Sequence, residues 1–180
     1  MKIAIGEEVR KRAKLPHDLY MTNVFLLNIP MVAATLAYTI GGNPVLVWAV
    51  LGALLCSLGV IGYIRWRAGR IDPAGDWFTA VHWRLSARRG NLLLIGYLAT
   101  GLIIGLGVLV GSASADPNMR TILLTIFTRI GIVPGLVLIL VTTILEGQAM
   151  HLVNNGIVPR RLAERHPPPP GTEILDEASE

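Results

Sequence analysis

The sequence predicts an all-α membrane protein that crosses the bilayer four times. Apolar residues make up 52% of the 180-residue chain and charged residues only 16%, with a mean hydropathy of +0.55. A typical soluble domain carries about 25% charged residues, so this chain has too few to cover a surface that faces water. The single cysteine also excludes a disulfide scaffold and a cysteine-rich zinc module.

Each predicted span meets the length that a bilayer requires. A hydrocarbon core about 30 Å thick needs about 20 apolar residues at about 1.5 Å of helix rise per residue. Four stretches satisfy this requirement: residues 22–40, 45–64, 92–111 and 121–146. The outer links, residues 41–44 and 112–119, are short and rich in turn-forming residues. We therefore expect the spans to form two antiparallel helical hairpins.

Basic residues are distributed unevenly along the chain and predict its orientation. Of the 16 basic residues, 14 lie in the N-terminal arm, in the middle loop 65–91 or after the fourth span. The positive-inside rule assigns this side to the cytoplasm. We expect a multi-pass protein of a bacterial-type inner membrane, with both termini cytoplasmic. This topology and anionic lipid headgroups account for the pI near 9.6, so no nucleic-acid partner is implied.

The middle loop, residues 65–91, contains a predicted short amphipathic helix. Asp76 is placed to cap the start of this helix and Gly90 to end it. Apolar residues share one broad face, with His82 and Trp83 near its edges, and arginines supply the charge. These residues are Trp77, Phe78, Val81 and Leu85, together with Arg84, Arg88 and Arg89. We expect this helix to lie on the inner leaflet; docking to another subunit is the alternative.

The chain is expected to form one domain followed by a tail. Residues 1–162 comprise the transmembrane domain with its cytoplasmic arm and middle loop. Residues 163–180 contain four consecutive prolines and then an acidic stretch. This composition predicts an extended spacer followed by disorder.

Small residues recur at four-residue spacing in two of the spans. They are Gly101, Gly105, Gly107 and Gly111 in the third span, and Ala49, Ala53 and Ser57 in the second. Small side chains let helix backbones approach closely in lipid. Internal packing of the bundle is one explanation and a subunit interface is the other. Because four spans cannot hide every such face, we expect association with other membrane subunits or with further copies of the chain.

The fourth span contains a charge well inside its ends. Arg129 lies about 12 Å from the outer end of the apolar run, a depth at which a charge is costly. Pro134 nearby, and Pro30 in the first span, each leave a backbone carbonyl without its helical donor. Two interpretations stay open. Arg129 either reaches outward to the headgroups, or it faces an internal polar site with Asn28.

No motif in the sequence indicates catalysis. The chain lacks a phosphate-binding loop, a Gly-x-Ser-x-Gly elbow and a His-Glu-x-x-His pair. His17, Asp18, Glu146 and His151 can meet near the inner surface, but their spacing is not that of a metal site. We therefore expect no catalytic residue, no cofactor and no metal.

These observations predict a non-catalytic structural or accessory subunit that self-associates or docks on a larger membrane complex. The alternative is a small oligomeric channel or transporter with a polar site formed by Asn28, Pro30, Arg129 and Pro134. The position of Arg129 distinguishes the two. An internal, hydrated Arg129 favours transport, whereas Arg129 at the headgroups favours the accessory role.

Overall fold

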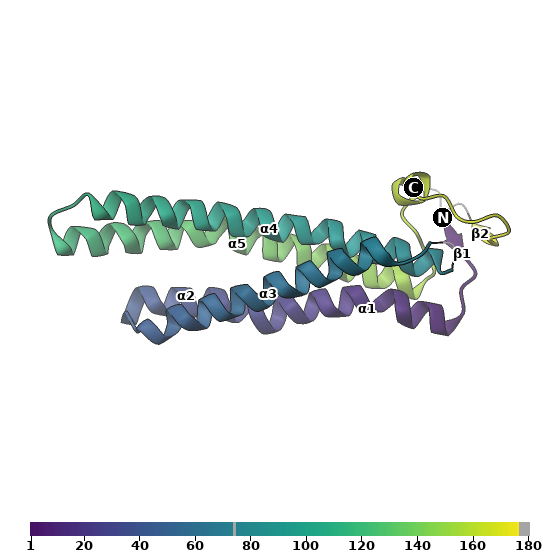
Figure 1. Ribbon diagram of the computed structural model, residues 1–180, viewed down its shortest axis with the longest axis horizontal. Helices are drawn as coiled ribbons and strands as arrows, with labels where there is room; N and C mark the ends of the chain where they lie inside the picture. The colour runs from purple at the N-terminus through teal and green to yellow at the C-terminus, as the bar shows by residue number, and fades with distance from the viewer. Residues whose placement is uncertain (74, 177–180) are drawn as a thin grey trace. The chain divides into compact units, whose positions relative to one another are not determined.

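The computed structural model describes residues 1–73 and 75–176, and most of the described residues are helical (Figure 1). In chain order the elements are β1 (Lys2–Ile3), α1 (Glu7–Asn23), η1 (Val24–Asn28), α2 (Ile29–Gly41), α3 (Pro44–Arg70), α4 (Trp77–Ser112), α5 (Pro117–Asn154), α6 (Arg160–Arg165) and β2 (Ile174–Asp176). The element η1 is a short π-helix. It connects α1 to α2 without a break in the helical backbone.

Four helices in the described part of the chain are long and apolar enough to cross a membrane. They are Glu7–Gly41, which joins α1, η1 and α2, and Pro44–Arg70, Trp77–Ser112 and Pro117–Asn154. At most 22% of the most apolar window of each helix is buried inside the protein. Apolar side chains therefore face outward, as expected when lipid is the solvent. The predicted all-α class with four long apolar helices is confirmed.

The chain forms two compact units. Unit 1 contains Met1–Thr22, Gly59–Gly90 and Thr143–Glu180, and unit 2 contains Asn23–Leu58 and Asn91–Thr142. The helices α3, α4 and α5 each contribute residues to both units. Of the 16 basic residues, 14 belong to unit 1.

Unit 1 has an apolar core assembled from distant parts of the chain. Its buried residues are Ile3, Ala13, Trp77, Phe78, Val81, Val153, Val158 and Leu162. The indole N–H of Trp77 donates to the backbone carbonyl of His166 at 2.8 Å. The core thus ties the start of α4 to both ends of the chain.

The predicted amphipathic helix is the first part of α4, and its predicted end at Gly90 is wrong. Its predicted start is correct, because the Asp76 carboxylate accepts the N–H of Thr79 at 3.2 Å. At Gly90 the helix continues, and the glycine instead allows close packing. A Cβ built on Gly90 would lie 3.2 Å from Cγ2 of Ile61. A glycine inside a helix costs only about 1 kcal/mol relative to alanine. The helix therefore continues through Gly90, because the packing against Ile61 outweighs the tendency of glycine to end a helix.

The apolar face of this segment is covered by the protein itself. Trp77, Phe78 and Val81 lie in the unit 1 core. Trp83 is 3% exposed, and its ring makes an edge contact with Tyr63, with centroids 6.0 Å apart. These side chains are therefore not free to lie on lipid, and the prediction of a membrane-surface face is wrong for them.

The two ends of the chain pair with each other. The strands β1 and β2 are antiparallel, with Lys2 opposite Asp176, and the N–H of Ile3 donates to the carbonyl of Gly156 at 2.9 Å. Gly156 has a φ of +67°, and a Cβ there would lie 2.7 Å from the Ile3 carbonyl oxygen. Only glycine fits this position. The structure thus differs from the predicted disordered tail at residues 174–176; residues 177–180 of that tail lie outside the described part.

Glycines allow α4 and α5 to pack closely in unit 2. A Cβ built on Gly107 would overlap Phe127, and one on Gly135 would lie 2.8 Å from the Thr100 hydroxyl. Gly131 is similarly close to Ile104, at 2.9 Å. Each helix therefore offers a glycine where its neighbour offers a larger side chain, which is how helices pack in lipid.

Candidate functional site

Asn28 lies at the centre of a buried polar network in unit 2. Its amide N–H donates to the Ser57 hydroxyl at 3.2 Å, and its amide oxygen accepts from the Tyr97 hydroxyl. The Ser57 and Tyr97 hydroxyls are 2.6 Å apart, so Ser57 donates to Tyr97, whose only proton goes to Asn28. The three side chains form a closed circle in which every hydroxyl both donates and accepts.

The network is positioned by the π-helix. Within η1 the N–H of Ile29 donates to the carbonyl of Val24, and the Asn28 amide also donates to the carbonyl of Asn23 at 3.0 Å. Pro30 follows directly in the first turn of α2 and has no N–H to donate. Single π-helical turns are frequent at functional sites, which makes this segment a candidate site.

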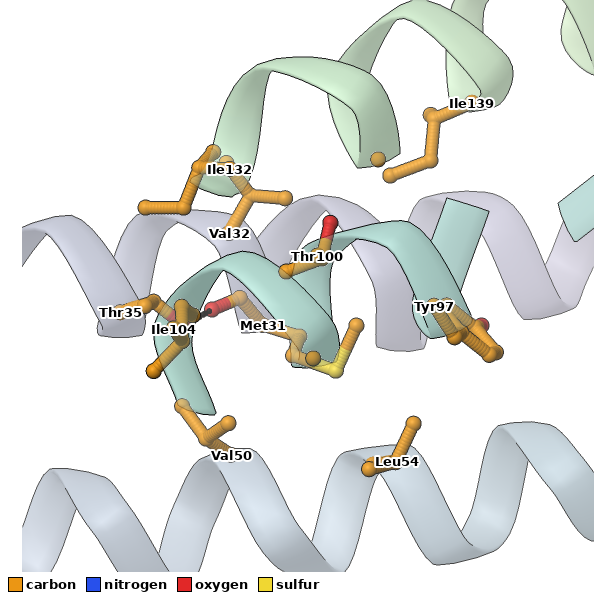
Figure 2. Close-up of a pocket in the computed structure, with 12 residues that line it drawn as sticks. Met31, Val32, Thr35, Val50, Leu54, Tyr97, Thr100, Ile104, Ile132 and Ile139 are labelled. Atoms are coloured by element: carbon orange, nitrogen blue, oxygen red, sulfur yellow. Dashed lines mark hydrogen bonds between the residues drawn. The ribbon is translucent and has the colours of Figure 1, made fainter. Parts of the chain in front are cut away.

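A cavity of about 190 Å³ lies in unit 2, lined by residues of α2, α3, α4 and α5 (Figure 2). Its walls are apolar apart from three hydroxyl groups. Tyr97 uses its hydroxyl in the Asn28 network, Thr35 donates to its own helix at the carbonyl of Met31, and Thr100 faces Gly135. Tyr97 is therefore both a wall of the cavity and a member of the network. The lining of the cavity is therefore suited to an apolar hydrocarbon chain.

Arg129 and Pro134 do not belong to this network. Arg129 is exposed, whereas Asn28 is fully buried and bonds to Asn23, Ser57 and Tyr97. In residues 1–73 and 75–176 no hydrogen bond or ion pair joins Arg129 to Asn28. Pro134 lies inside α5 without ending the helix. The structure thus brings together only Asn28 and Pro30 of the four residues predicted as an intramembrane site.

The predicted small-residue positions have different surroundings. Gly107 and Gly111 contact α5, at Phe127 and Arg120 respectively. A Cβ built on Gly101 or Gly105 meets nothing within 4 Å, and Gly101 lines the cavity. Ala49 is exposed, Ala53 is half-buried and Ser57 is buried in the Asn28 network. Whether the open positions form a subunit interface stays a prediction.

A second buried polar cluster, the histidine cluster of His17, His82 and Glu146, lies in unit 1. All three side chains are fully buried. Nδ1 of His17 is 2.5 Å from Oε2 of Glu146, and Nε2 of His17 is 3.1 Å from Nδ1 of His82. Nη1 of Arg89 lies 3.8 Å from the other Glu146 oxygen. The result is a hydrogen-bonded chain from His82 to a carboxylate, with a guanidinium at its end.

One face of α4 supplies His82 and the neighbouring Arg89. His82, Ser86 and Arg89 follow the i, i+4, i+7 spacing that aligns side chains along a helix. The Ser86 hydroxyl donates to the carbonyl of Pro16 at 3.3 Å, and the Tyr20 hydroxyl donates to the carbonyl of Arg89 at 3.3 Å. These bonds hold α1 against α4 on both sides of His17.

Sequence reasoning found part of this cluster. It grouped His17 and Glu146 with Asp18 and His151, whereas the structure joins them to His82 and Arg89. The signal for the correct partners was the polar stripe of His82, Ser86 and Arg89, which borders the aromatic face of the same helix. No group of three His, Cys, Asp or Glu side chains in the described residues is arranged to hold a metal ion.

Comparisons with protein family models, with curated proteins and with solved structures find no match for this chain. Its function therefore has to be inferred from its own residues. They offer an exposed arginine in an apolar surface, a polar network beside an apolar cavity, and a buried histidine cluster.

Proposed function

We propose that this protein is a non-catalytic structural or accessory subunit of a membrane complex, and that it docks through the α5 surface that carries Arg129. The observation that carries the proposal is the exposure of this guanidinium within an apolar surface. Its neighbours Ile126, Ile130 and Val133 are 46%, 56% and 54% exposed. A charge at the bilayer centre costs about 2.5–3.5 kcal/mol on insertion scales. Arg129 therefore needs headgroups or a polar group of a partner.

The depth of Arg129 supports this role. A groove of about 430 Å³ is lined by Gly41 and Gly42, at the end of α2, and by α5 residues between Arg120 and Thr128. Gly42 has a left-handed φ of +64°, and a turn whose backbone groups leave the helix has to lie at or beyond the edge of the hydrocarbon. We infer that the outer membrane boundary crosses α5 in this segment. Arg129 is the next residue along, so its long side chain reaches the boundary.

We further propose that the four long helices cross a bacterial-type inner membrane as two antiparallel hairpins, with both termini in the cytoplasm. Support comes from the 14 of 16 basic residues that belong to unit 1. Tyr63 and Trp66 near the end of α3 are about half exposed, and the Arg70 guanidinium lies 4.9 Å from the Trp66 ring centroid. Exposed aromatic and basic residues of this kind are typical of a membrane–water interface.

The test is the native mass and composition of the protein purified in mild detergent. The wild type should run as a complex of defined stoichiometry, well above the 19.5 kDa of one chain. Arg129→Leu should dissociate this complex while the chain stays folded. Arg120→Leu removes the other arginine of unit 2 and is the matched control, which should keep the complex. A monomeric wild type whose behaviour does not change in Arg129→Leu would contradict the proposal.

A second function, a small channel or transporter, is favoured by the Asn28 network. Polar side chains inside a membrane often mark a substrate or ion pathway, and Tyr97 borders the cavity. Ion flux into proteoliposomes, followed with proton- and potassium-sensitive dyes, tests this function. Flux that is present in the wild type, lost in Tyr97→Phe and kept in the exposed-position control Tyr63→Phe would favour transport over the accessory role.

A further inference from the structure

The histidine cluster is held together by protons, and its geometry limits how many protons it can hold. The His17–Glu146 contact joins a nitrogen and an oxygen 2.5 Å apart, and the His17–His82 contact joins two nitrogens 3.1 Å apart. An imidazole nitrogen donates when it carries a hydrogen and accepts when it does not. Each contact therefore needs one hydrogen between its two atoms.

Two protons satisfy both contacts. With Glu146 ionised beside Arg89, the Nδ1–H of His17 donates to the carboxylate. The Nδ1–H of His82 then donates to the bare Nε2 of His17. Both rings are neutral in this state, and the single negative charge of Glu146 faces the single positive charge of Arg89.

A third proton is also accommodated. It makes His17 an imidazolium, which donates from Nδ1 to Glu146 and from Nε2 to His82. His82 then accepts at Nδ1 and keeps its own hydrogen on Nε2, on the far side of its ring. The positive ring lies between a carboxylate and a neutral imidazole, so both contacts persist.

A fourth proton breaks the cluster. Hydrogens on both facing nitrogens would point at each other across 3.1 Å. Two imidazolium rings would also be held together in a fully buried site, where water cannot screen their repulsion. This repulsion between the two rings is relieved only if α1 moves away from α4.

We propose that His17, His82 and Glu146 form a proton-binding latch, which holds α1 to α4 and α5 at neutral pH and releases α1 on acidification. Among the described residues, the other charged or titratable groups at the cluster are Arg89, from α4, and Tyr20, from α1. Arginine stays protonated and an ordinary tyrosine stays neutral at mildly acidic pH. The latch therefore responds through the two histidines.

The direction of the pH effect follows from the proton count. Histidines released into water bind a proton near pH 6.5, whereas the closed cluster excludes the fourth proton. The open state thus binds more protons than the closed state. The closed state is favoured above about pH 6.5, and each further unit of acidity shifts the balance toward the open state by about tenfold per proton.

Hydrogen–deuterium exchange of the full chain in detergent micelles at pH 7.5 and 5.5 tests the latch. After correction for the intrinsic pH dependence of exchange, amides of residues 10–20 in α1 should lose protection by about tenfold at pH 5.5. Amides of α2 provide the internal reference and should not change. Equal protection of residues 10–20 at both pH values would overturn the proposal.

Three histidine variants assign the effect to the cluster. His82→Phe places an apolar ring beside Phe78, whose own ring lies 4.5 Å from that of His82, and should abolish the pH dependence of α1. The controls are His151→Gln, at an exposed position of α5, and His166→Gln. Partial burial and the nearby Arg84, Arg88 and Arg165 lower the pKa of His166. This control therefore removes a histidine outside the cluster whose pKa is also shifted. Both controls should keep the wild-type response.

Histidine ¹⁵N chemical shifts of the wild type provide a test that needs no variant. Two buried rings should share one hydrogen between Nε2 and Nδ1 at pH 7.5, and the fraction of protein with two separate imidazoliums should rise as the pH falls to 5.5. Unchanged spectra across this range would overturn the latch. So would a His82→Phe protein whose α1 responds to pH like the wild type.

Discussion

Unit 1 and unit 2 contain parts of the same helices but bury different side chains. Of the 19 buried hydrophobic residues in the described part of the chain, 15 belong to unit 1. Of the 33 exposed large hydrophobic residues, 27 belong to unit 2. In unit 1 these helices therefore bury their apolar residues in a core, as water-soluble proteins do. In unit 2 the same helices expose apolar residues on the outer surface. We propose that a different solvent around each unit, water for unit 1 and lipid for unit 2, explains this difference.

The two units also depend on different forces. Unit 1 is stabilised by burial of Trp77, Phe78 and other apolar residues, which is the main drive in water. In lipid that drive is absent, so helices rely on close packing of small residues and on hydrogen bonds. The glycine contacts of α4 and α5, and the closed circle around Asn28, are of this second kind. Substitutions in the two units should therefore have different consequences.

The largest effect is expected in unit 1, for Glu146→Ala. This change leaves the His17 Nδ1 and the Arg89 guanidinium without their buried partner, and breaking a buried pair costs about 3–5 kcal/mol. Thermal or denaturant unfolding in detergent measures the loss. Glu164→Ala is the matched control, because Glu164 forms an exposed pair with Arg160 at 3.3 Å, and exposed pairs contribute about 1 kcal/mol or less. Equal losses would show that burial of the cluster does not matter.

A smaller effect is expected in unit 2, for Gly107→Ala. The new Cβ would overlap Phe127, and overpacking of this kind costs about 1–3 kcal/mol. Gly105→Ala is the control on the same helix, with nothing within 4 Å of the added atom. It should be neutral or stabilise the helix by about 0.5–1 kcal/mol. If both variants melt alike, then α4 and α5 do not pack through Gly107.

The open face at Gly105 can be tested with a larger side chain. Gly105→Leu should leave the unfolding midpoint of the protomer unchanged, because no atom of the described residues lies within 4 Å of a Cβ added at Gly105. A fall in native mass in this variant would identify the open face as the subunit interface that small-residue spacing predicts. An unchanged mass would show that this face contacts lipid.

The smallest measurable loss of stability is expected for Tyr97→Phe. It removes the donor to the Asn28 amide oxygen and leaves that buried acceptor unpaired, at a cost of about 1–3 kcal/mol. Because Tyr97 is only partly buried, the loss should fall at the lower end of this range. The exposed-position control Tyr63→Phe should melt like the wild type. A larger loss in Tyr63→Phe than in Tyr97→Phe would contradict the role of the network.

Sequence reasoning succeeded where the signal was local. Four apolar stretches of bilayer length predicted the four long helices, because length and composition alone define such a segment. Asp76 was recognised as a helix cap from its own type and position. Asn28 was singled out as an unusual polar residue inside a span, although its partners Ser57 and Tyr97 were not identified.

The failures concern contacts between distant parts of the chain. Gly90 has the local pattern of a helix end, but Ile61 packs against it and the helix continues. His82 was assigned to the edge of an interfacial helix, because the polar stripe that it forms with Ser86 and Arg89 does not indicate which distant helix packs against it. The pairing of Lys2 with Asp176 likewise joins the two ends of the chain. Spacing within one helix does not contain this information.

Cysteine labelling of intact cells tests most directly the central claim that unit 2 lies in the bilayer and the basic unit 1 in the cytoplasm. Cys56, the single native cysteine, is first replaced by alanine. A membrane-impermeant maleimide should then label Ser114→Cys, in the link between α4 and α5, in intact cells. Glu8→Cys, at an exposed position of α1, should be labelled only after lysis. Labelling of Glu8→Cys in intact cells, with protection of Ser114→Cys, would contradict this account.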